Sequence, residues 1–349
     1  MTQLCAASQA GLQAKIAGLQ SRPELNGARA KVLKYLPDKN RFQIRLASDE
    51  ACLSVKATNL QFEDTADGEL QTTRVTSERA NAFRVMEVDG RGKGVIALEA
   101  VQKGELLWVE TPVLSHCRPV QFATSHSFHP EEISMLWGQF SALAESDKSR
   151  VRSLANKSNN SRFAELSPHQ LVQTFATNAF QPEETTRMAD VAGGSTRGSV
   201  SSDMLFLLTA RLNHSCSPNC TRRVQAGKVT VFAARNVEKG EELTFSYIGF
   251  WHDHGFRQQV FQRDYGFVCK CPVCSLGPAE LAESDARRRQ YDWLDDELPK
   301  LRKAKQWKEL LQVCAKMRAI CKEEGDDTPL MLVEGNERRT REKLEKNRK

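Results

Sequence analysis

The sequence has few features of membrane, secreted or dedicated nucleic-acid-binding proteins. No run of eighteen apolar residues occurs in its 349 residues, so no membrane-spanning helix is expected. The first twenty residues lack the charged start and long apolar stretch of a secretory signal. The 50 Lys and Arg nearly balance the 44 Asp and Glu, whereas phosphate recognition needs a concentrated basic face. We therefore expect a soluble intracellular protein, nuclear or cytoplasmic, without membrane association.

The small positive excess lies mainly at the C-terminal end. Between Asn336 and Lys349, seven Lys or Arg outnumber three Glu, a net charge of +4. Tails of this kind are usually just solvated. The functional alternative is a weak attraction to nucleic acid, acidic proteins or a nuclear import receptor.

Hydrophobic periodicity divides the chain into several segments. Apolar residues at helical spacing predict a short N-terminal helix, and alternating runs between turn formers then predict a small β-barrel-like, SH3-like module. Its default interpretation is packing on the next unit, and the alternative is peptide or nucleic-acid binding. The pattern predicts an α+β protein with an N-terminal helix or tail (1–22), the β module (23–62), a linker (63–80), a β-rich unit with a helical insert at about 125–190 (81–275), and C-terminal helices with a basic tail (276–349).

The sequence also predicts a surface loop and a break between C-terminal helices. Residues 190–202 are rich in Gly and Ser and predict a surface loop. The C-terminal segment has helical apolar spacing, and Pro299 predicts a break within it.

The strongest chemical signal is the run CKCPVC, which places Cys269, Cys271 and Cys274 within six residues. Three thiols so close together can converge on one tetrahedral ion, and zinc is the ion that such sites prefer. A disulfide between Cys269 and Cys271 would be strained, because neighbours two apart on an extended chain point to opposite sides. Zinc then needs a fourth ligand, which Cys216, Cys220 or His214 could supply. A site with four protein ligands is structural, so catalysis must lie elsewhere.

Four further segments accompany the thiols: GRGKG from Gly90, ARLNHSCSPN from Ala210, GEELTFSY from Gly240 and DYGFVCKC from Asp264. Each has an ordinary explanation when taken alone. The first could be a plain hairpin turn, His214 a core histidine and Tyr247 a strand residue. Their occurrence once each, and in order, favours a functional site.

In this order the segments resemble the SET domain, and in particular the SET-and-MYND subfamily of protein lysine methyltransferases, over residues 81–275. The resemblance implies small β-sheets around a pseudoknot, a post-SET zinc site and S-adenosylmethionine as methyl donor. The segment Pro112–Ala164 has one cysteine, too few for a two-zinc MYND insert. Lys93 stands where relatives often have a small polar residue.

The resemblance also implies roles for individual residues. Tyr247 matches the catalytic tyrosine, and Tyr265 would line the channel of the target lysine. The cofactor would be bound by Gly92, Lys93, Gly94, Asn178, Asn213, His214, Tyr247 and Phe267. The zinc ligands would be Cys216, Cys269, Cys271 and Cys274, with Cys220 as the alternative to Cys216.

The reaction so implied is methyl transfer to the lysine amine of a protein substrate, histone or otherwise, by a monomeric enzyme. Its main requirements are positioning and exclusion of water. Two other functions remain open: a SET-fold binding module without turnover, and a zinc-stabilised scaffold. The presence of Tyr247, Asn213 and His214 favours activity over the binding module without turnover. Tight binding of S-adenosylmethionine would separate the scaffold from the other two functions.

Overall fold

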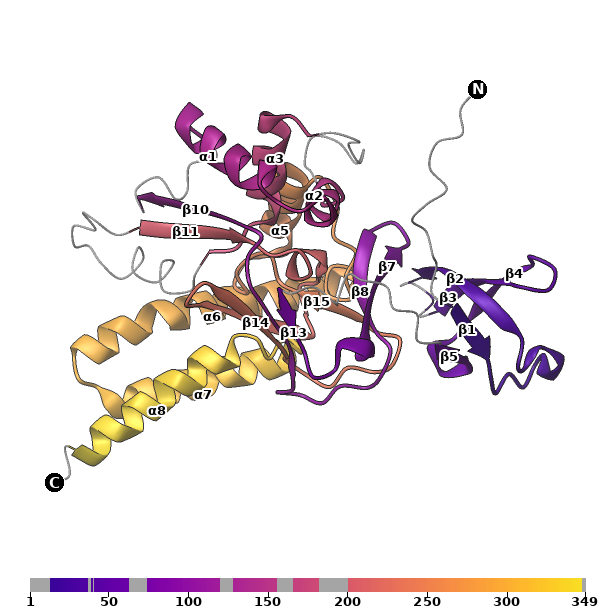
Figure 1. Cartoon of the computed structure of the whole chain (residues 1–349). Coiled ribbons are helices and arrows are strands. Elements are labelled where there is room, and N and C mark those ends of the chain that lie inside the picture. Colours follow the sequence, from indigo (N-terminus) through magenta and orange to yellow (C-terminus); the bar gives the residue numbers. More distant parts are fainter. Residues whose placement is uncertain are drawn as a thin grey trace. The chain divides into compact units, whose positions relative to one another are not determined.

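The computed structural model describes residues 13–36, 39, 41–62, 74–119, 128–155, 166–181 and 200–346. Sheets of nine, four and two strands occur together with helices in this part of the chain (Figure 1), so the predicted α+β class is confirmed. The residues divide into two compact units. The first comprises Met1–Leu154, Arg162–Asn213 and Arg222–Leu243, and the second comprises Ala155–Ser161, His214–Thr221 and Thr244–Lys349.

The first unit begins with a five-stranded β module. Its strands are β1 (Gln13–Ile16), β2 (Arg29–Leu36), β3 (Arg41–Leu46), β4 (Cys52–Val55) and β5 (Leu60–Phe62). All pairs within the module are antiparallel, β1 with β2 and β5, and β3 with β2 and β4. Alternate side chains such as Val32, Phe42 and Ile44 form its buried core. Strands β2 to β5 lie where alternation predicted strands.

The prediction of a helix near the N-terminus is wrong for residues 13–16, which form β1. Ala14 and Ile16 are buried while the residue between them is exposed, a period of two that suits a strand. Pairing with β2 and β5 satisfies the backbone of this segment. The β module therefore starts at residue 13, and residues 1–12 lie outside the described residues.

The β module packs on the rest of the first unit. Strand β2 pairs in parallel with β7 (Phe83–Val88) through Tyr35 and Val88, and Lys239 Nζ donates a hydrogen bond to the Leu60 carbonyl at 3.0 Å. These contacts support the packing interpretation of the module.

The remaining strands belong to three sheets, and the large sheet contains the Gly-rich turn. In the large sheet, β7 pairs with β8 (Gly92–Ala97), which pairs with β15 (Glu242–Phe245). The four-stranded sheet has the order β13 (Cys220–Gln225), β14 (Lys228–Ala233), β9 (Leu106–Glu110), β6 (Val75–Thr76). A third pair joins β10 (Leu114–Pro119) to β11 (Val200–Leu205).

The predicted linker and the predicted surface loop each include residues that form a strand. The predicted linker 63–80 includes β6, because Val75 and Thr76 pair with β9. The predicted loop 190–202 includes the start of β11, whose residues pair with β10 from Val200 onward. In each case the pairing partner is distant in sequence and gives no local signal. Residues 63–73 and 190–199 lie outside the described residues.

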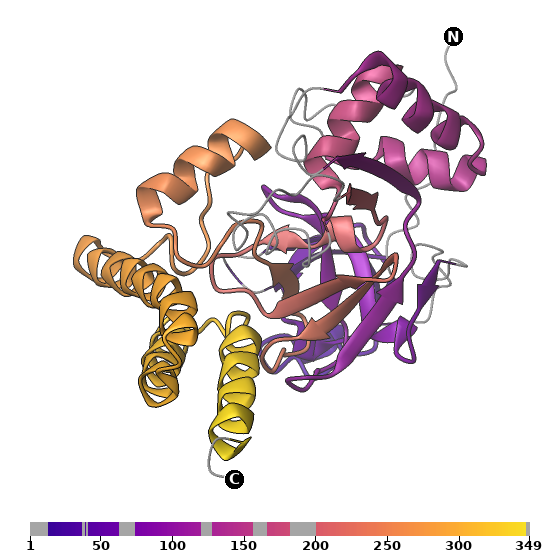
Figure 2. The same cartoon turned by 90° about the vertical axis from the view of Figure 1, so that its left-hand side faces the viewer.

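The predicted helical insert contains α1 (Pro130–Ser141), α2 (Glu145–Arg152) and α3 (Pro168–Asn178). Figures 1 and 2 both show these helices grouped together. Ser167 begins α3 with a capping box, accepting from Gln170 N at 3.3 Å. The apolar faces meet in a core that includes Leu136, Leu171 and Phe175.

The second unit contains α5 (His254–Val260), the π-helical turn η7 (Phe261–Tyr265), α6 (Pro278–Lys303), α7 (Trp307–Glu323) and α8 (Leu330–Lys346). The predicted break at Pro299 is wrong, because α6 continues to Lys303. Leu294 and Leu298 are buried on one face, and their packing outweighs the hydrogen bond that proline cannot make. The chain turns only after α6, where Lys305 has a φ of 57°.

A buried ion pair connects α6 with the segment around Cys216. Arg288 on α6 donates to Glu324 Oε2 at 3.0 Å, to the Phe250 carbonyl at 2.8 Å and to the Cys216 carbonyl at 3.1 Å. Both charged side chains are almost fully buried. Since a buried charge without partners costs several kcal/mol, this set of bonds fixes the backbone at Cys216.

Asp326, just after α7, should make the stability of the protein depend on pH. Its side chain is 1% exposed, and burial raises its pKa from 3.8 to about 6. The stabilisation of the protonated form is fully present below pH 3.8 and is lost as pH rises through about 6, at a total cost of about 3 kcal/mol. We expect Asp326→Asn to gain stability relative to the wild type by up to this amount between pH 4 and pH 7.

Urea denaturation of both proteins across this range measures the difference directly. Contributions from ionisable groups that do not interact with Asp326 cancel in the comparison. A constant difference between variant and wild type from pH 4 to pH 7 would contradict the raised pKa.

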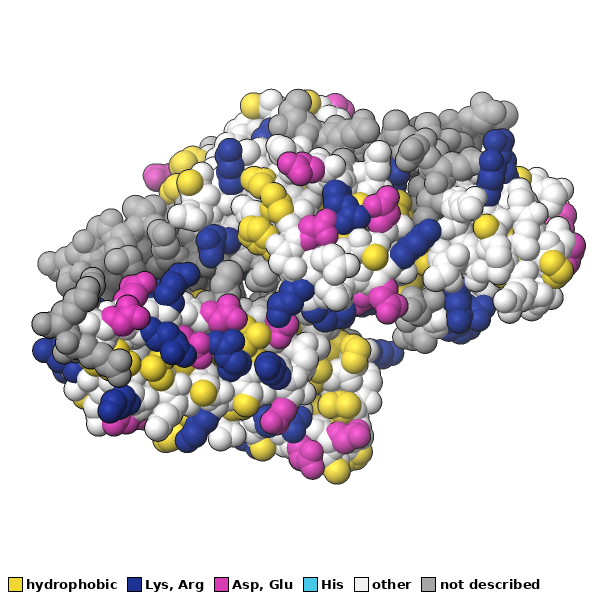
Figure 3. All heavy atoms as spheres, turned by 90° about the horizontal axis from the view of Figure 1, so that it is seen from below, with side chains coloured by type: hydrophobic (Ala, Val, Ile, Leu, Met, Phe, Trp, Pro, Cys, Tyr) yellow, Lys and Arg dark blue, Asp and Glu magenta, His cyan; other side chains and the backbone are white. Residues whose placement is uncertain are grey.

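The face shown in Figure 3 carries Lys and Arg interspersed with Asp and Glu, without a concentrated basic region. Within the described residues, no helix is long and apolar enough to cross a bilayer.

Candidate functional site

The Gly-rich turn lies at the start of β8 in the first unit. Gly92 has a φ of 67°, which favours glycine. Gly94 is required by close packing: an added Cβ would lie 2.5 Å from Glu242 Oε1, 2.7 Å from Val88 Cγ2 and 2.9 Å from Asn213 Nδ2. The backbone of β8 therefore approaches these side chains more closely than any other residue would permit.

Asn213 is tied to this turn. Its Nδ2 donates to the Lys93 carbonyl at 3.2 Å and to Glu242 Oε1 at 2.7 Å. The structure thus brings together four residues that the sequence predicted as cofactor-binding: Gly92, Lys93, Gly94 and Asn213. Asn178, also predicted, lies at the end of α3 and donates to the Thr174 carbonyl in its own helix at 2.8 Å. Its role stays a prediction.

Glu242 and Arg91 are the members of this arrangement that the sequence did not predict. Glu242 is 6% exposed, and Arg91 Nη1 contacts its Oε2 at 2.7 Å. Burial raises the pKa of Glu242, while the charge of Arg91 and the hydrogen bond from Asn213 oppose the rise. The available signal was a charged residue at the first position of β15, whose sequence is Glu-Leu-Thr-Phe.

Glycine 94 gives a direct test of this packing. We expect Gly94→Ala to push apart Glu242 and Asn213 and to weaken binding of S-adenosylmethionine at least about tenfold, because the new methyl needs about 1 Å of backbone movement. Titration calorimetry measures the affinity. Gly138→Ala is the matched control, since a Cβ there meets nothing within 4 Å and should stabilise α1 by about 0.5–1 kcal/mol. Unchanged binding by Gly94→Ala would contradict the assignment of the turn.

His214 lies in the second unit, where its ring contacts Tyr247 and Cys216. Its Nδ1 accepts a hydrogen bond from Tyr247 N at 3.1 Å, and its Nε2 lies 3.2 Å from Cys216 Sγ. Because Nδ1 accepts from a backbone N–H, the proton of the neutral ring is on Nε2 and points to the sulfur. Ser215 N donates to the Phe245 carbonyl at 3.2 Å. The NHSC segment therefore lies beside the strand that leads to Tyr247.

Aromatic rings surround Tyr247. Its ring centroid lies 5.0 Å from that of Tyr265, 6.4 Å from that of Phe267 and 4.9 Å from that of Phe245. Phe261 stacks on Phe267 at 5.2 Å. The structure thus brings together the three aromatic residues predicted for catalysis, the lysine channel and the adenine. All three are half-buried, which suits a surface that a ligand can reach.

Four thiols form one cluster in the same unit. The Sγ atoms of Cys216, Cys269, Cys271 and Cys274 all lie within 4.8 Å of one another, and none of these cysteines forms a disulfide. The Sγ atoms of Cys216 and Cys274 are 3.6 Å apart. Sulfurs bound to one tetrahedral zinc lie about 3.8 Å apart, given a bond of about 2.3 Å. The four thiols could hold a metal ion of this kind.

Of the three candidates for the fourth ligand, Cys216 is the one that lies in the cluster. Cys220 is not in the cluster, since its buried Sγ contacts Asn219 Oδ1 at 3.5 Å. His214 contacts Cys216 Sγ, so it fits the role of a residue that orients a ligand. Hydrogen bonds from the neighbouring thiols lower the pKa of Cys271, which favours the thiolate. The buried Arg257 lies 4.0 Å from Cys274 Sγ and adds positive charge.

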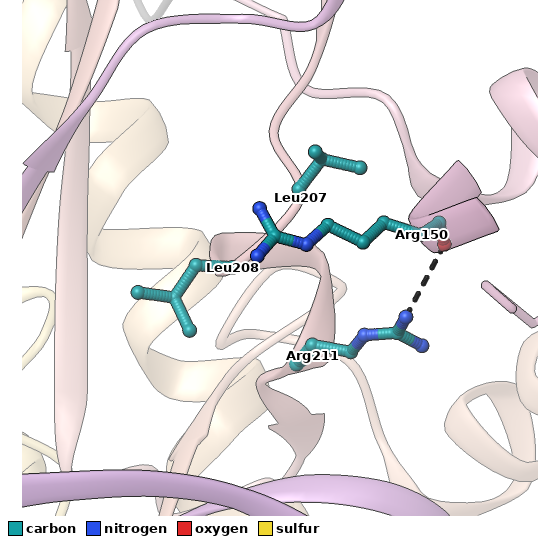
Figure 4. A pocket seen from close by; sticks show the side chains of 4 residues that line it. All are labelled: Arg150, Leu207, Leu208 and Arg211. Carbon is teal, nitrogen blue, oxygen red and sulfur yellow. Dashed lines mark hydrogen bonds between the residues drawn. The ribbon is translucent and has the colours of Figure 1, made fainter. Parts of the chain in front are cut away.

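The hollow in Figure 4 is not the cofactor site. It is lined by Arg150, Leu207, Leu208 and Arg211 and has room for no more than about one water molecule. Arg211 donates to the carbonyls of Ser153 and Arg150 at 2.8 and 3.3 Å. These bonds anchor the turn η6 (Thr209–Arg211) that precedes Asn213.

Comparison with known proteins identifies the fold of this site. Residues 92–248 match the family model of the SET domain. This part of the chain is therefore similar to a SET domain, in agreement with the motifs. The chain is 28% identical to Histone-lysine N-methyltransferase set5 of Schizosaccharomyces pombe over 222 residues, which are 63% of this chain and 59% of that protein.

Two other relatives are more similar to this chain, but over shorter segments. Histone-lysine N-methyltransferase SET5 of Meyerozyma guilliermondii is 40% identical over 74 residues, 20% of this chain and 15% of that protein. SET domain and MYND-type zinc finger protein 6 of S. pombe is 37% identical over 70 residues, 20% of this chain and 14% of that protein. The chain thus spans less than two thirds of each of these relatives.

Proposed function

We propose that the chain is an S-adenosylmethionine-dependent protein lysine methyltransferase. The observation that carries this proposal is the arrangement around His214, whose ring joins the backbone of Tyr247 to Cys216 in the thiol cluster. It connects the residue predicted for catalysis to the four clustered thiols. The SET-domain match and the names of the relatives support the same reaction class.

Different residues would bind the two ends of the cofactor. Gly92, Lys93, Gly94 and Asn213 would bind its amino-acid end, with Asn178 as a further contact. Phe267 would cover the adenine, since an aromatic face suits a planar base. The ring of His214 is occupied by Tyr247 and Cys216, so its contribution to binding would come from its backbone. Tyr247 would contact the sulfonium end.

The bound cofactor supplies a methyl group on a positively charged sulfur. Tyr247 and Tyr265 would enclose the target lysine and exclude water from it. Desolvation lowers the pKa of a lysine amine and favours the neutral form that can attack. The Tyr247 hydroxyl would orient that amine in line with the methyl group, and positioning of this kind supplies much of the rate of such a reaction.

The thiol cluster would hold zinc in a structural role. All four positions of a tetrahedral ion would be taken by Cys216, Cys269, Cys271 and Cys274, which leaves none for substrate. The ion would fix the segment that carries Phe267 next to the NHSC segment. Folding of this part of the second unit would then depend on the metal.

The target lysine lies in a protein, and histones are the first candidates because they are named in the relatives. The test is incubation with labelled S-adenosylmethionine, a panel of histones and total cell lysate. We expect label on lysine side chains with the wild type and its loss with Tyr247→Phe. Cofactor binding without transfer to any protein would favour a silent binding module, and absence of binding would favour a zinc-stabilised scaffold.

A further inference from the structure

The amide of Asn213 has a defined orientation. One of the two groups that face its nitrogen is the Lys93 carbonyl, which can only accept a hydrogen bond. The nitrogen, and not the oxygen, must therefore point to Lys93 and to Glu242. Among the residues that the structure describes, none donates a hydrogen bond to Asn213 Oδ1. This oxygen remains available as an acceptor.

Glu242 maintains this orientation from a buried position. One of its carboxylate oxygens accepts from Asn213 at 2.7 Å, and the other contacts Arg91 at 2.7 Å. An ion pair on one side and a hydrogen bond on the other leave the carboxylate little freedom to rotate. Arg91 and Lys93 belong to the same Gly-rich turn. Glu242 contacts Arg91 directly and is connected to the Lys93 carbonyl through Asn213.

The packing around Gly94 brings the two side chains close to the backbone of β8. Glu242 Oε1 and Asn213 Nδ2 both lie within 3.0 Å of the position that a Cβ on Gly94 would occupy. The absence of that atom allows the carboxylate and the amide to meet directly above the backbone. The buried charge is costly, which is a reason to look for a function beyond stability.

We propose that Glu242, held by Arg91, is a positioning residue that orients Asn213 so that its Oδ1 accepts a hydrogen bond from the ammonium group of S-adenosylmethionine. This inference rests on the proposed function and adds a residue to it. Glu242 acts through Asn213 and does not contact the cofactor. Its effect should therefore appear only with ligands that carry the ammonium group.

Two related ligands separate this role from a merely structural one. S-adenosylhomocysteine contains the amino-acid end, and 5′-methylthioadenosine lacks it. We expect Glu242→Ala to weaken binding of S-adenosylhomocysteine about tenfold, the effect of losing one charge-assisted hydrogen bond. Glu242→Gln, which keeps an acceptor oxygen, should lie between the alanine variant and the wild type. Binding of 5′-methylthioadenosine should change less than twofold in both.

A double-mutant cycle tests whether the effect passes through Asn213. In an Asn213→Ala background, Glu242→Ala should cost less than twofold further in affinity, because the amide that it orients is gone. Equal weakening for both ligands, or full additivity of the two substitutions, would overturn the inference. Thermal unfolding and metal content establish that each variant is folded, and Glu242→Gln serves for the comparison if the alanine variant is not.

Ligand binding by the wild type separates a failure of the proposed function from a failure of the positioning role of Glu242. If the wild type binds neither S-adenosylmethionine nor S-adenosylhomocysteine, the proposed function fails. If it binds both and the variants of Glu242 bind them equally well, only the positioning role fails.

Discussion

Replacing Tyr247 by phenylalanine should lower methyl transfer about 100-fold or more while leaving S-adenosylmethionine affinity within about threefold. The substitution removes one hydroxyl and keeps the ring that packs between Phe245 and Tyr265. In the proposed function the ring would contribute to binding in the ground state, whereas the hydroxyl would orient the amine only during transfer. Loss of an interaction made only in the transition state lowers kcat and kcat/KM equally. Misplacement by about 1 Å is enough for a loss of this size.

Single-turnover transfer and titration calorimetry on the same preparations separate the two effects. Tyr291→Phe is the matched control, because it removes the same hydroxyl in the helical core of the second unit, where Tyr291 packs against Phe250. Its activity should stay within about twofold. Equal losses of affinity and turnover in Tyr247→Phe would reject the catalytic role.

Cys271→Ser should release the metal and unfold the segment around Phe267. A tetrahedral thiolate site that loses one of four ligands binds zinc far more weakly, and the binding free energy of structural zinc, about 10 kcal/mol or more, is also folding free energy. The small apolar cluster around Cys216, Phe261 and Val273 cannot replace it. We expect less than about 0.1 zinc per chain and a lower unfolding temperature.

Elemental analysis and thermal unfolding measure both quantities. Cys220→Ser is the matched control: it removes a buried thiol that the structure places outside the cluster, and it should retain one zinc per chain. Retention of zinc by Cys271→Ser, or its loss from Cys220→Ser, would contradict the ligand assignment.

Local chemistry explains why much of the site could be predicted. Cys269, Cys271 and Cys274 are close in sequence and must be close in space. The Gly-rich turn is likewise a local feature, and the structure gives Gly92 a positive φ and Gly94 close contacts that leave no space for a Cβ. The motif order predicted the SET domain, which the family match confirms for residues 92–248.

Contacts between distant residues could not be predicted. Arg91 and Glu242 are 151 positions apart, and nothing in either local sequence indicates their pairing. The fourth member of the thiol cluster was open for the same reason, since Cys216 and Cys220 are equally plausible until the chain is folded. The sequence placed His214 in a family motif, but it did not indicate that the ring of His214 would contact Cys216.

The errors in secondary structure have a related cause. Four apolar residues at helical spacing suggested a helix at the N-terminus, but pairing with β2 and β5 made residues 13–16 a strand. At Pro299 the local penalty was real, yet burial of Leu294 and Leu298 kept α6 continuous. Tertiary packing decided both cases against local propensity.

The most direct test is calorimetric titration of the wild type with S-adenosylmethionine after its zinc content has been measured. We predict one zinc and one cofactor per chain, with a dissociation constant of about 100 µM or tighter, as is usual for enzyme substrates. Removal of zinc by a chelator should abolish that binding. A folded protein with one zinc per chain and no detectable binding at about 1 mM cofactor would contradict the account.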